Sequence, residues 1–181
     1  VTFIVRGANL EAIRNHGMKL IMHDGSEHVA RQVKATNDYA AAGVQDIVIL
    51  AMKAHQLDAV ATDVPKLLGP HTVIVTMQNG IPFWYFHKHG GTLAGSQVKS
   101  VDPSGVIGAN LPAEQVLGCV VYPASELVAP GVVRHIEGDR FPVGELDGSL
   151  SERAQRVADC FVKAGFKSPV LDNIRAEMWL K

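Results

Sequence analysis

The chain has 181 residues, slightly more than the roughly 150 of an average domain, so we expect one main folded unit. Its 17 lysines and arginines face 18 aspartates and glutamates, which leaves a formal charge of −1 and no basic surplus for binding nucleic acid. The longest apolar run, residues 47–52, is far shorter than the roughly 18 residues of a membrane-spanning helix. These features argue against nucleic-acid and membrane partners and favour a soluble globular protein.

The two cysteines, Cys119 and Cys160, are too few and too far apart for a disulfide framework or a four-thiolate metal site. We expect both to be buried apolar side chains in a reducing compartment, the cytoplasm, because the sequence shows no basic leader followed by an apolar core. The chain opens on Val1 without an initiator methionine and closes on Lys181 inside a helix-like segment. We therefore expect a fragment of a larger protein.

The first elements alternate between strand and helix patterns. Residues 1–6 are β-rich and apolar, and the next segment predicts a short helix that ends near Gly17. Residues 18–23 and 27–35 flank Asp24-Gly25, a dipeptide typical of a hairpin turn. A strand, a helix and an exposed hairpin are therefore expected in this order.

The central segment predicts a β-α-β unit. Residues 46–51 form a continuous apolar run, typical of a parallel strand that is covered on both faces, so we expect it in the middle of a sheet. Apolar residues at helical spacing fill 57–68, with Gly69-Pro70 as a stop signal. Residues 72–77 predict the next buried strand.

The following segment predicts a connection and an antiparallel extension. Residues 90–112 are rich in glycine, serine and proline and indicate a long surface connection without a domain boundary. Three short strand candidates then follow at 116–122, 132–137 and 141–145, so the sheet is expected to be mixed.

Two helices are predicted near the end of the chain. Residues 149–152 fit a capping box for a helix that ends at Gly165. Its apolar face consists of Ala154, Val157, Ala158, Phe161 and Val162. A last short strand is expected at 169–171, and Asp172 is expected to cap a helix that carries Ile174, Met178 and Lys181 on one side. The alternation predicts an open α/β sheet with ligand sites beyond the carboxyl ends of its strands.

That rule selects Arg6, residues 52–56 and residues 78–80 as candidate site positions. In a dinucleotide-binding fold, an arginine at the end of the second strand favours a 2′-phosphate through forked hydrogen bonds, so Arg6 would select NADP. Taken alone, an arginine at a strand end is more often a solvated surface residue. The G-x-G-x-x-G fingerprint is absent, so the motifs by themselves leave the function undecided.

Four segments carry a family resemblance. Asn173 to Lys181 (Asn-Ile-Arg-Ala-Glu-Met-Trp-Leu-Lys) resembles the helix signature of 2-dehydropantoate 2-reductases, or ketopantoate reductases, the NADPH enzymes of pantothenate synthesis. Residues 5–7, 53–56 (the family's K-A-x-Q) and 78–80 (its N-G turn) match in the same order and spacing. The resemblance covers essentially the whole chain.

The resemblance implies a Rossmann-like, doubly wound α/β fold with a mixed sheet, lacking the first strand, the Gly-rich loop and the first helix. Residues 1–172 would form the NADP-binding domain. Residues 173–181 would begin the helix that leads to an absent α-helical C-terminal domain. The absent strand would leave a gap flanked by residues 1–6 and 47–50.

The resemblance also implies roles in catalysis and substrate binding. Lys181 matches the family's catalytic lysine, whose ammonium can hydrogen-bond the keto oxygen and deliver a proton, more readily if burial lowers its pKa. By position alone it would be a helix-end lysine reaching for solvent. Asn79 matches the residue that touches both cofactor and substrate, since an amide both donates and accepts. By itself Asn79 is also compatible with a simple turn before Gly80.

Further positions resemble cofactor contacts. Lys53 and Gln56 match positions beside the phosphates and ribose of NADP(H), although Gln56 is equally compatible with a first-turn helix residue that faces water. Ala124 aligns with a backbone contact to the cofactor, but the preceding Tyr122-Pro123 departs from the family pattern. Arg6 would select the 2′-phosphate of NADP(H).

Two other residue groups suggest different chemistry. Residues 23–28 contain two histidines, an aspartate and a glutamate, but strand alternation would splay them to both faces, so a hairpin explains them better than a metal site. We expect no bound metal. The aromatic residues 83–86 suggest a stacking platform for a base, but core packing is the more common use of such a cluster.

The resulting hypothesis is NADPH-dependent reduction of ketopantoate to pantoate, with a small 2-keto acid as substrate and a homodimer as one assembly. A reductase of another 2-keto acid, or a non-catalytic nucleotide-binding or structural fragment, remains an alternative. A metal-dependent hydrolase that uses the histidines is a third interpretation.

Overall fold

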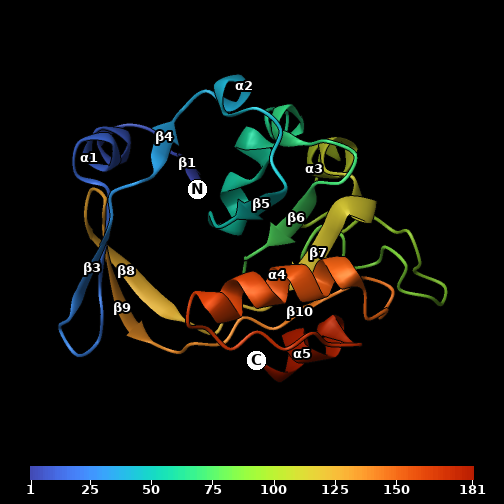
Figure 1. Ribbon diagram of the computed structural model, residues 1–181. Helices are drawn as coiled ribbons and strands as arrows, with labels where there is room; N and C mark the ends of the chain where they lie inside the picture. Colours follow the sequence, from blue (N-terminus) through green and yellow to red (C-terminus); the bar gives the residue numbers. More distant parts are fainter. The chain divides into compact units, whose positions relative to one another are not determined.

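The computed structural model describes residues 1–181, and the chain divides into two compact units. The first unit combines residues 1–43 with 123–138, and the second combines residues 44–122 with 139–181. The first unit contains a two-stranded and a four-stranded sheet, and the second unit contains one four-stranded sheet (Figure 1).

The first unit begins with the predicted strand and helix. β1 (Thr2–Ile4) leads to α1 (Ala8–His16), and β4 (Lys34–Thr36) pairs in parallel with β1. Gly17 follows α1 with a φ of 79°, and a Cβ at this position would overlap the carbonyl oxygen of Ala30. Only glycine fits this junction, so the predicted end of the helix is confirmed and its cause is steric.

A short helix closes this part of the first unit. α2 (Tyr39–Ala42) begins after Asp38, whose carboxylate accepts hydrogen bonds from the backbone amides of Ala40 and Ala41. These bonds satisfy two of the amides that have no partner inside the helix.

The other sheet of the first unit contains the predicted hairpin. β2 (Met18–Ile21) and β3 (Glu27–Ala30) are antiparallel, and in their turn the Asp24 carboxylate accepts a hydrogen bond from the backbone amide two residues later. β9 (Val132–Glu137) runs parallel to β2, and β8 (Ala124–Ala129) pairs antiparallel with β9. The sequence does not predict β8, because its mostly exposed residues carry no pattern of burial.

The second unit contains the predicted buried strands in one sheet of order β10-β7-β6-β5. β5 (Ile47–Leu50), β6 (Val73–Thr76) and β7 (Val116–Cys119) run parallel. β10 (Val143–Gly144) pairs antiparallel with β7. The prediction of a mixed sheet is confirmed.

β6 lies in the interior of this sheet, and β5 forms its edge. All four residues of β6 are buried, whereas Ile49 of β5 is 45% exposed. The central position expected from the apolar run is therefore wrong, whereas the exposed edge of β5 agrees with the gap expected beside residues 47–50. A continuous apolar run reports what the side chains are, but it contains no information on how many neighbours a strand has.

The connection between β5 and β6 is not the predicted α-helix. It consists of three short 3₁₀ helices, η1 (Ala54–Gln56), η2 (Asp58–Val60) and η3 (Val64–Leu67). Pro65 has no N–H to donate, so a continuous α-helix would lose a hydrogen bond at this point. The predicted apolar face is nevertheless buried, and its buried members are Leu57, Ala61, Val64 and Leu67.

The segment 90–112 is only partly a surface connection. Its second half returns to the core through α3 (Val106–Asn110), where Ile107 and Leu111 are fully buried. The Asp102 carboxylate accepts hydrogen bonds from the amides of Ile107 and Gly108 and so fixes the start of this helix. η4 (Ala113–Gln115) then leads into β7.

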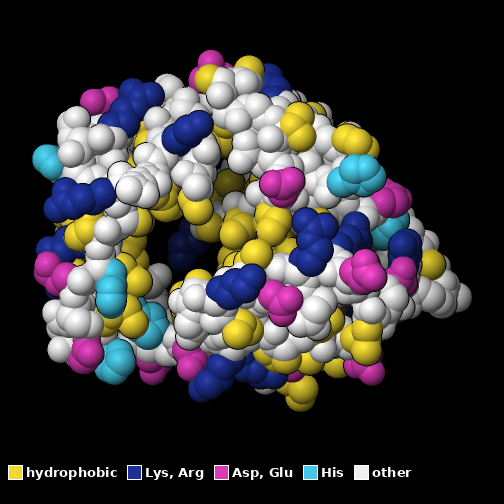
Figure 2. Space-filling view, viewed as in Figure 1, with side chains coloured by type: hydrophobic (Ala, Val, Ile, Leu, Met, Phe, Trp, Pro, Cys, Tyr) yellow, Lys and Arg dark blue, Asp and Glu magenta, His cyan; other side chains and the backbone are white.

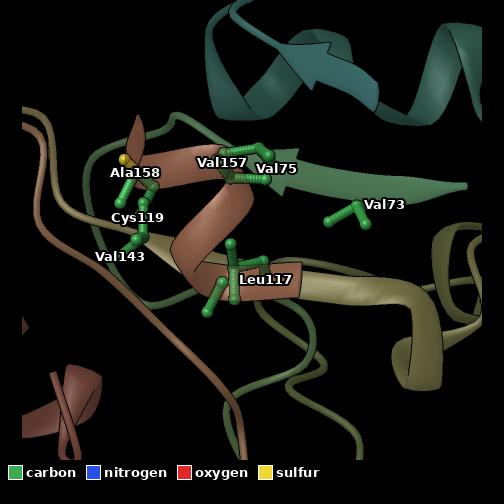
Figure 3. Close-up of a cluster of buried hydrophobic side chains, with 8 residues drawn as sticks. Val73, Val75, Leu117, Cys119, Val143, Val157 and Ala158 are labelled. Atoms are coloured by element: carbon green, nitrogen blue, oxygen red, sulfur yellow. The ribbon is translucent and has the colours of Figure 1, made fainter. Parts of the chain in front are cut away.

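α4 (Glu152–Lys163) covers one face of the sheet of the second unit (Figure 3). The shared core consists of Val73, Val75, Leu117, Cys119, Val143, Ala154, Val157 and Ala158. Val162, which was expected on this face, is 55% exposed, whereas Phe161 packs against the core. Cys160 is also exposed, contrary to expectation, because its position on the helix turns it away from the sheet.

The N-cap of α4 is Ser151, and the capping box expected at 149–152 is therefore shifted. The Ser151 hydroxyl accepts a hydrogen bond of 3.1 Å from the Ala154 amide. The Ser149 hydroxyl instead donates to the carboxylate of Asp147. Either serine is a suitable N-cap residue, and the sequence alone does not show which of them caps the helix.

The opposite face of the sheet is covered by Trp84 and by α5 (Ile174–Leu180). A Cβ on Gly118 would lie 2.9 Å from the Trp84 ring and 3.0 Å from Ile174, so glycine permits the close approach of both. The Trp84 indole donates a hydrogen bond of 3.0 Å to Thr76 Oγ1. Packing is therefore confirmed as the role of this aromatic residue, and the sheet is covered on both faces.

The beginning of α5 differs from the prediction. Asn173, not Asp172, is the N-cap, and its side chain accepts a hydrogen bond of 3.0 Å from the Ala176 amide. The strand expected at 169–171 is reduced to a single bridge between Val170 and Val143.

None of the helices combines the length and the apolar character needed to cross a bilayer. On the face shown in Figure 2, lysines and arginines alternate with aspartates and glutamates. This mixture agrees with the formal charge of −1.

Candidate active site

The carboxyl ends of β5, β6 and β7 meet at one edge of the sheet, because the three strands are parallel. Leu50 pairs with Thr76, and Thr76 pairs with Gly118. The polar residues Lys53 and Asn79 follow these strands at equal distances along the chain. The register therefore places the predicted site segments 52–56 and 78–80 at the edge where α/β sheets bind their ligands.

Lys181 reaches this edge from the end of α5. Its Nζ donates a hydrogen bond of 2.6 Å to Asn79 Oδ1 and another to the carbonyl oxygen of Val121. The same Nζ lies 5.7 Å from the centroid of the Tyr122 ring. The structure thus brings together Asn79 and Lys181, two of the residues selected from the sequence, although 102 positions separate them.

Burial shifts the pKa values of two groups at this edge. Loss of hydration lowers the pKa of the Lys181 ammonium. Burial raises the pKa of the Cys119 thiol to about 12, so the thiol is neutral at physiological pH. Cys119 is therefore an apolar wall and not a counter-ion for Lys181.

A cavity of about 30 Å³ lies beside Lys181 and Asn79. Its other walls are Gln78, Gly80, Cys119, Val120 and Met178. The Nε2 atom of Gln78 is buried and has no hydrogen-bond partner. A buried donor without an acceptor is costly, so this amide is suited to a ligand or water oxygen.

Three residues that no sequence pattern marks form a hydrogen-bonded cluster, and one of them, Tyr122, lies beside Lys181. The Tyr122 hydroxyl donates a hydrogen bond of 2.9 Å to Glu177 Oε1, and Arg140 donates one of 2.7 Å to the same oxygen. The Arg140 guanidinium lies 5.2 Å from the centroid of the Tyr122 ring. Glu177 is only 9% exposed. The available signals were the spacing of four between Glu177 and Lys181 on one helix and the departure of Tyr122 from the family pattern.

Lys53 and Gln56 occupy the turn after β5. The side-chain oxygen of Gln56 accepts a hydrogen bond of 3.1 Å from the Lys53 backbone amide, so Gln56 shapes this turn and retains its NH₂ group for other contacts. The Lys53 side chain is exposed. The Lys181 ammonium is hydrogen-bonded to Asn79 and to the Val121 carbonyl, and not to Lys53 or Gln56.

Arg6 and Ala124 belong to the first unit, whereas Lys181 and Asn79 belong to the second. Arg6 is exposed and directly precedes Gly7, the N-cap of α1. Ala124 is the first residue of β8, where it pairs with Glu137. An exposed guanidinium beside a helix N-terminus is suited to an anionic group.

A larger cavity of about 400 Å³ lies on the second unit along α5, lined among others by Tyr85, Lys88, Asp147 and Trp179. Arg175 borders it and donates to the carbonyl oxygens of Tyr85, Leu146 and His87. These bonds occupy the guanidinium, so Arg175 anchors α5 to residues 85–87 and to the loop that follows β10. No three histidine, cysteine, aspartate or glutamate side chains converge in a way that would hold a metal ion.

Comparison with known proteins gives a consistent set of relatives. A curated 2-dehydropantoate 2-reductase from Mesorhizobium japonicum is 48% identical over the whole chain, which covers 55% of that relative. An uncharacterized oxidoreductase from Bacillus subtilis, YkpB, is 28% identical over the whole chain, which covers 52% of it. The chain therefore spans about half the length of the curated relatives it matches.

Solved structures of ketopantoate reductases are also similar to this chain. A candidate ketopantoate reductase from Ralstonia solanacearum MolK2 has a TM-score of 0.93 and 39% identity over 99% of this chain and 55% of its own. A 2-dehydropantoate 2-reductase from Geobacter metallireducens has a TM-score of 0.78 and 23% identity over 99% of this chain and 52% of its own, a likeness of fold. The expected Rossmann-like α/β fold is confirmed. The family profile described as Ketopantoate reductase PanE/ApbA matches residues 1–148, so the chain belongs to this family.

Proposed function

We propose that this chain is the cofactor-binding part of an enzyme that reduces 2-dehydropantoate to pantoate with NADPH, a step of pantothenate biosynthesis in the cytoplasm. Residues 1–172 form the NADP-binding domain, and residues 173–181 begin the helix that leads into the rest of the enzyme. One observation carries the proposal: the Lys181 ammonium is fixed by Asn79 and Val121 at the carboxyl edge of the parallel strands. The 48% identity to a protein named 2-dehydropantoate 2-reductase supports the choice of substrate.

Each of the polar groups proposed for the cofactor is suited by its chemistry to one part of a phosphorylated dinucleotide. Arg6 offers a forked set of donors to the 2′-phosphate, and Lys53 offers an exposed ammonium to the pyrophosphate or ribose. The free NH₂ group of Gln56 and the backbone of Ala124 add donors and acceptors. When bound, NADPH supplies the hydride for the keto carbon.

Lys181 can donate a hydrogen bond to the keto oxygen of a 2-keto acid. An ammonium has three N–H groups, of which two are directed to Asn79 Oδ1 and the Val121 carbonyl, so one remains for the substrate's keto oxygen. This cation stabilises the negative charge that develops on the oxygen and then gives it a proton. Burial favours this transfer because it lowers the pKa of Lys181.

Asn79 is oriented by the same contact. Since its Oδ1 accepts the hydrogen bond from Lys181, its Nδ2 group is the side that remains for cofactor or substrate. Asn79 therefore both fixes the lysine and offers a donor to the bound reactants. This double use explains why one amide serves as a substrate-binding and a cofactor-binding residue.

Substrate-dependent oxidation of NADPH by the full-length enzyme tests the proposal. Ketopantoate is compared with pyruvate, 2-ketoisovalerate and phenylglyoxylate, and each is also tested with NADH. We expect the highest kcat/KM for ketopantoate with NADPH. A higher value for another 2-keto acid would replace the substrate, and the absence of turnover with all four would overturn the assignment as an enzyme of this class.

A further inference from the structure

Tyr122, whose ring centroid lies 5.7 Å from Lys181 Nζ, forms a hydrogen-bonded cluster with Glu177 and Arg140. Tyr122 follows β7, Arg140 precedes β10, and Glu177 lies one helical turn before Lys181, so three separate segments of the second unit meet here. Glu177 Oε1 receives hydrogen bonds from the Tyr122 hydroxyl at 2.9 Å and from Arg140 at 2.7 Å. Both ends of the tyrosine are thereby held, the hydroxyl by Glu177 and the ring face by Arg140.

Glu177 does not act as the counter-ion of Lys181. The spacing of four residues on a helix would allow an ion pair between them. Glu177 instead forms an ion pair with Arg140, at 2.7 Å. The Lys181 ammonium is surrounded by neutral groups, namely the Asn79 amide oxygen, the Val121 carbonyl and the Tyr122 ring.

We propose that Tyr122 is a positioning residue, whose ring, held by Glu177 and Arg140, supports the Lys181 ammonium and directs it toward the site formed with Asn79. This inference rests on the proposed function, in which Lys181 acts on the keto oxygen. It goes beyond that function because it assigns the placement of the lysine to an aromatic ring and not to a carboxylate. A carboxylate in that place would hold the ammonium strongly and make it a poorer acid.

At 5.7 Å from the ammonium, the ring should have an electrostatic effect on Lys181. The face of an aromatic ring stabilises a nearby cation, so it favours the protonated form of Lys181 without neutralising it. The charged groups near the lysine are Glu177 on its own helix and Arg140 from the neighbouring segment, which pair with each other. Cys119 of β7 is protonated. Removal of the ring should therefore shift Lys181 toward its neutral amine form.

The test compares Tyr122→Leu with Tyr122→Phe in the full-length enzyme. Leucine keeps the site apolar but removes the π face, so we expect kcat to fall roughly 3- to 10-fold. The pH midpoint of Lys181 labelling by an amine-acylating reagent, measured by mass spectrometry, should fall by about half a unit. Tyr122→Phe keeps the ring and should recover most of both quantities. KM for NADPH should stay close to that of the unmodified enzyme.

Phe166→Leu is the matched control. It also removes a half-buried ring from the second unit, but this ring packs against Phe141 and not against Lys181. We expect it to lower stability without changing the midpoint of Lys181 labelling. If Tyr122→Leu does not fold, as judged by circular dichroism, Tyr122→Met provides the same loss of the ring with a more adaptable side chain.

The outcomes separate this inference from the proposed function. An unchanged kcat and labelling midpoint in Tyr122→Leu, with Lys181→Ala inactive, would overturn the role of Tyr122 and leave the function intact. Full activity of Lys181→Ala would overturn the proposed function itself. A fall in kcat in Tyr122→Leu that Tyr122→Phe fails to recover would assign the effect to the hydroxyl and contradict a role for the ring.

Discussion

Lys181 is a surface residue by exposure, yet its ammonium is surrounded by defined partners. Asn79, Val121 and the Tyr122 ring hold it without a negative charge, so it remains a cation with a lowered pKa. This combination suits a group that must first attract a developing oxyanion and then release a proton. The same residues would be unremarkable if each were considered alone.

Arg6 gives a prediction about cofactor choice at the scale of one residue. Arg6→Ala should weaken NADPH binding by the full-length enzyme roughly ten- to hundredfold, because a charge-assisted hydrogen bond to the 2′-phosphate is lost. The affinity for NADH, which lacks that phosphate, should hardly change. Titration calorimetry with both nucleotides measures the two effects.

Arg31→Ala is the control for this prediction, since Arg31 is also an exposed arginine of the first unit. It should leave the preference for NADPH unchanged. An equal loss of NADPH and NADH affinity in Arg6→Ala would contradict the role of Arg6 as a selector of the phosphate.

Some site residues are readable from the sequence and others are not. Arg6, Lys53 and Asn79 follow apolar strands, so the rule of strand ends selects them without a structure. Tyr122, Glu177 and Arg140 meet from segments up to 55 positions apart, and no local pattern marks them. Lys181 was selected through the resemblance to a family, because its position alone indicates only a helix end.

At the scale of elements, the close contact of α5 with the sheet determines where the Lys181 side chain lies. Gly118→Ala would place a Cβ 2.9 Å from Trp84 and 3.0 Å from Ile174, and both neighbours are buried. We expect this change to lower the free energy of unfolding by about 1–3 kcal/mol, because a packed interface has no room for a methyl group. Urea unfolding of the full-length enzyme measures it.

Gly108→Ala serves as the comparison for this variant. Gly108 lies in α3, and its added Cβ would be 3.4 Å from the nearest side-chain atom, an ordinary contact. Alanine favours the helix by up to about 1 kcal/mol, so this variant should be neutral or stabilising. Equal destabilisation by both substitutions would show that close packing at Gly118 is not the cause.

The cap of α4 gives a second prediction at this scale. Ser151→Ala removes the acceptor for the Ala154 amide and the hydroxyl partner of Glu145, so it should cost about 1 kcal/mol of stability. Ser149→Ala removes only an exposed contact with Asp147 and should cost less. Thermal unfolding of the two variants compares them directly, and a larger loss in Ser149→Ala would contradict the assigned cap.

The elements show where sequence patterns are sufficient. The hairpin around Asp24-Gly25 and the buried strand at 73–76 follow from local signals, and the structure contains both. The edge position of β5 does not follow from its apolar run, although the resemblance implies a gap beside residues 47–50. The 3₁₀ path of residues 54–67 does not follow from local signals either, because the break at Pro65 decides it. Apolar spacing predicted which side chains are buried better than it predicted the type of helix.

At the scale of the whole molecule, the residues proposed for NADP(H) come from both units. Arg6 and Ala124 belong to the first unit, whereas Lys53, Gln56 and Asn79 belong to the second. The proposed catalytic group, Lys181, is in the second unit. Cofactor affinity and turnover should therefore respond to different substitutions, with Arg6 acting on binding and Lys181 acting on the chemical step.

The pH dependence of ketopantoate reduction by the full-length enzyme and by Lys181→Ala tests the central claim most directly. The ammonium exists below its pKa, so kcat/KM should fall as the pH rises through a pKa that burial has lowered from 10.5. Lys181→Ala should lose roughly 10²- to 10⁴-fold in kcat and show no such alkaline limb, while its affinity for NADPH is unchanged. Lys163→Ala, an exposed lysine of α4, is the control. An active Lys181→Ala enzyme with the same alkaline limb would contradict the account.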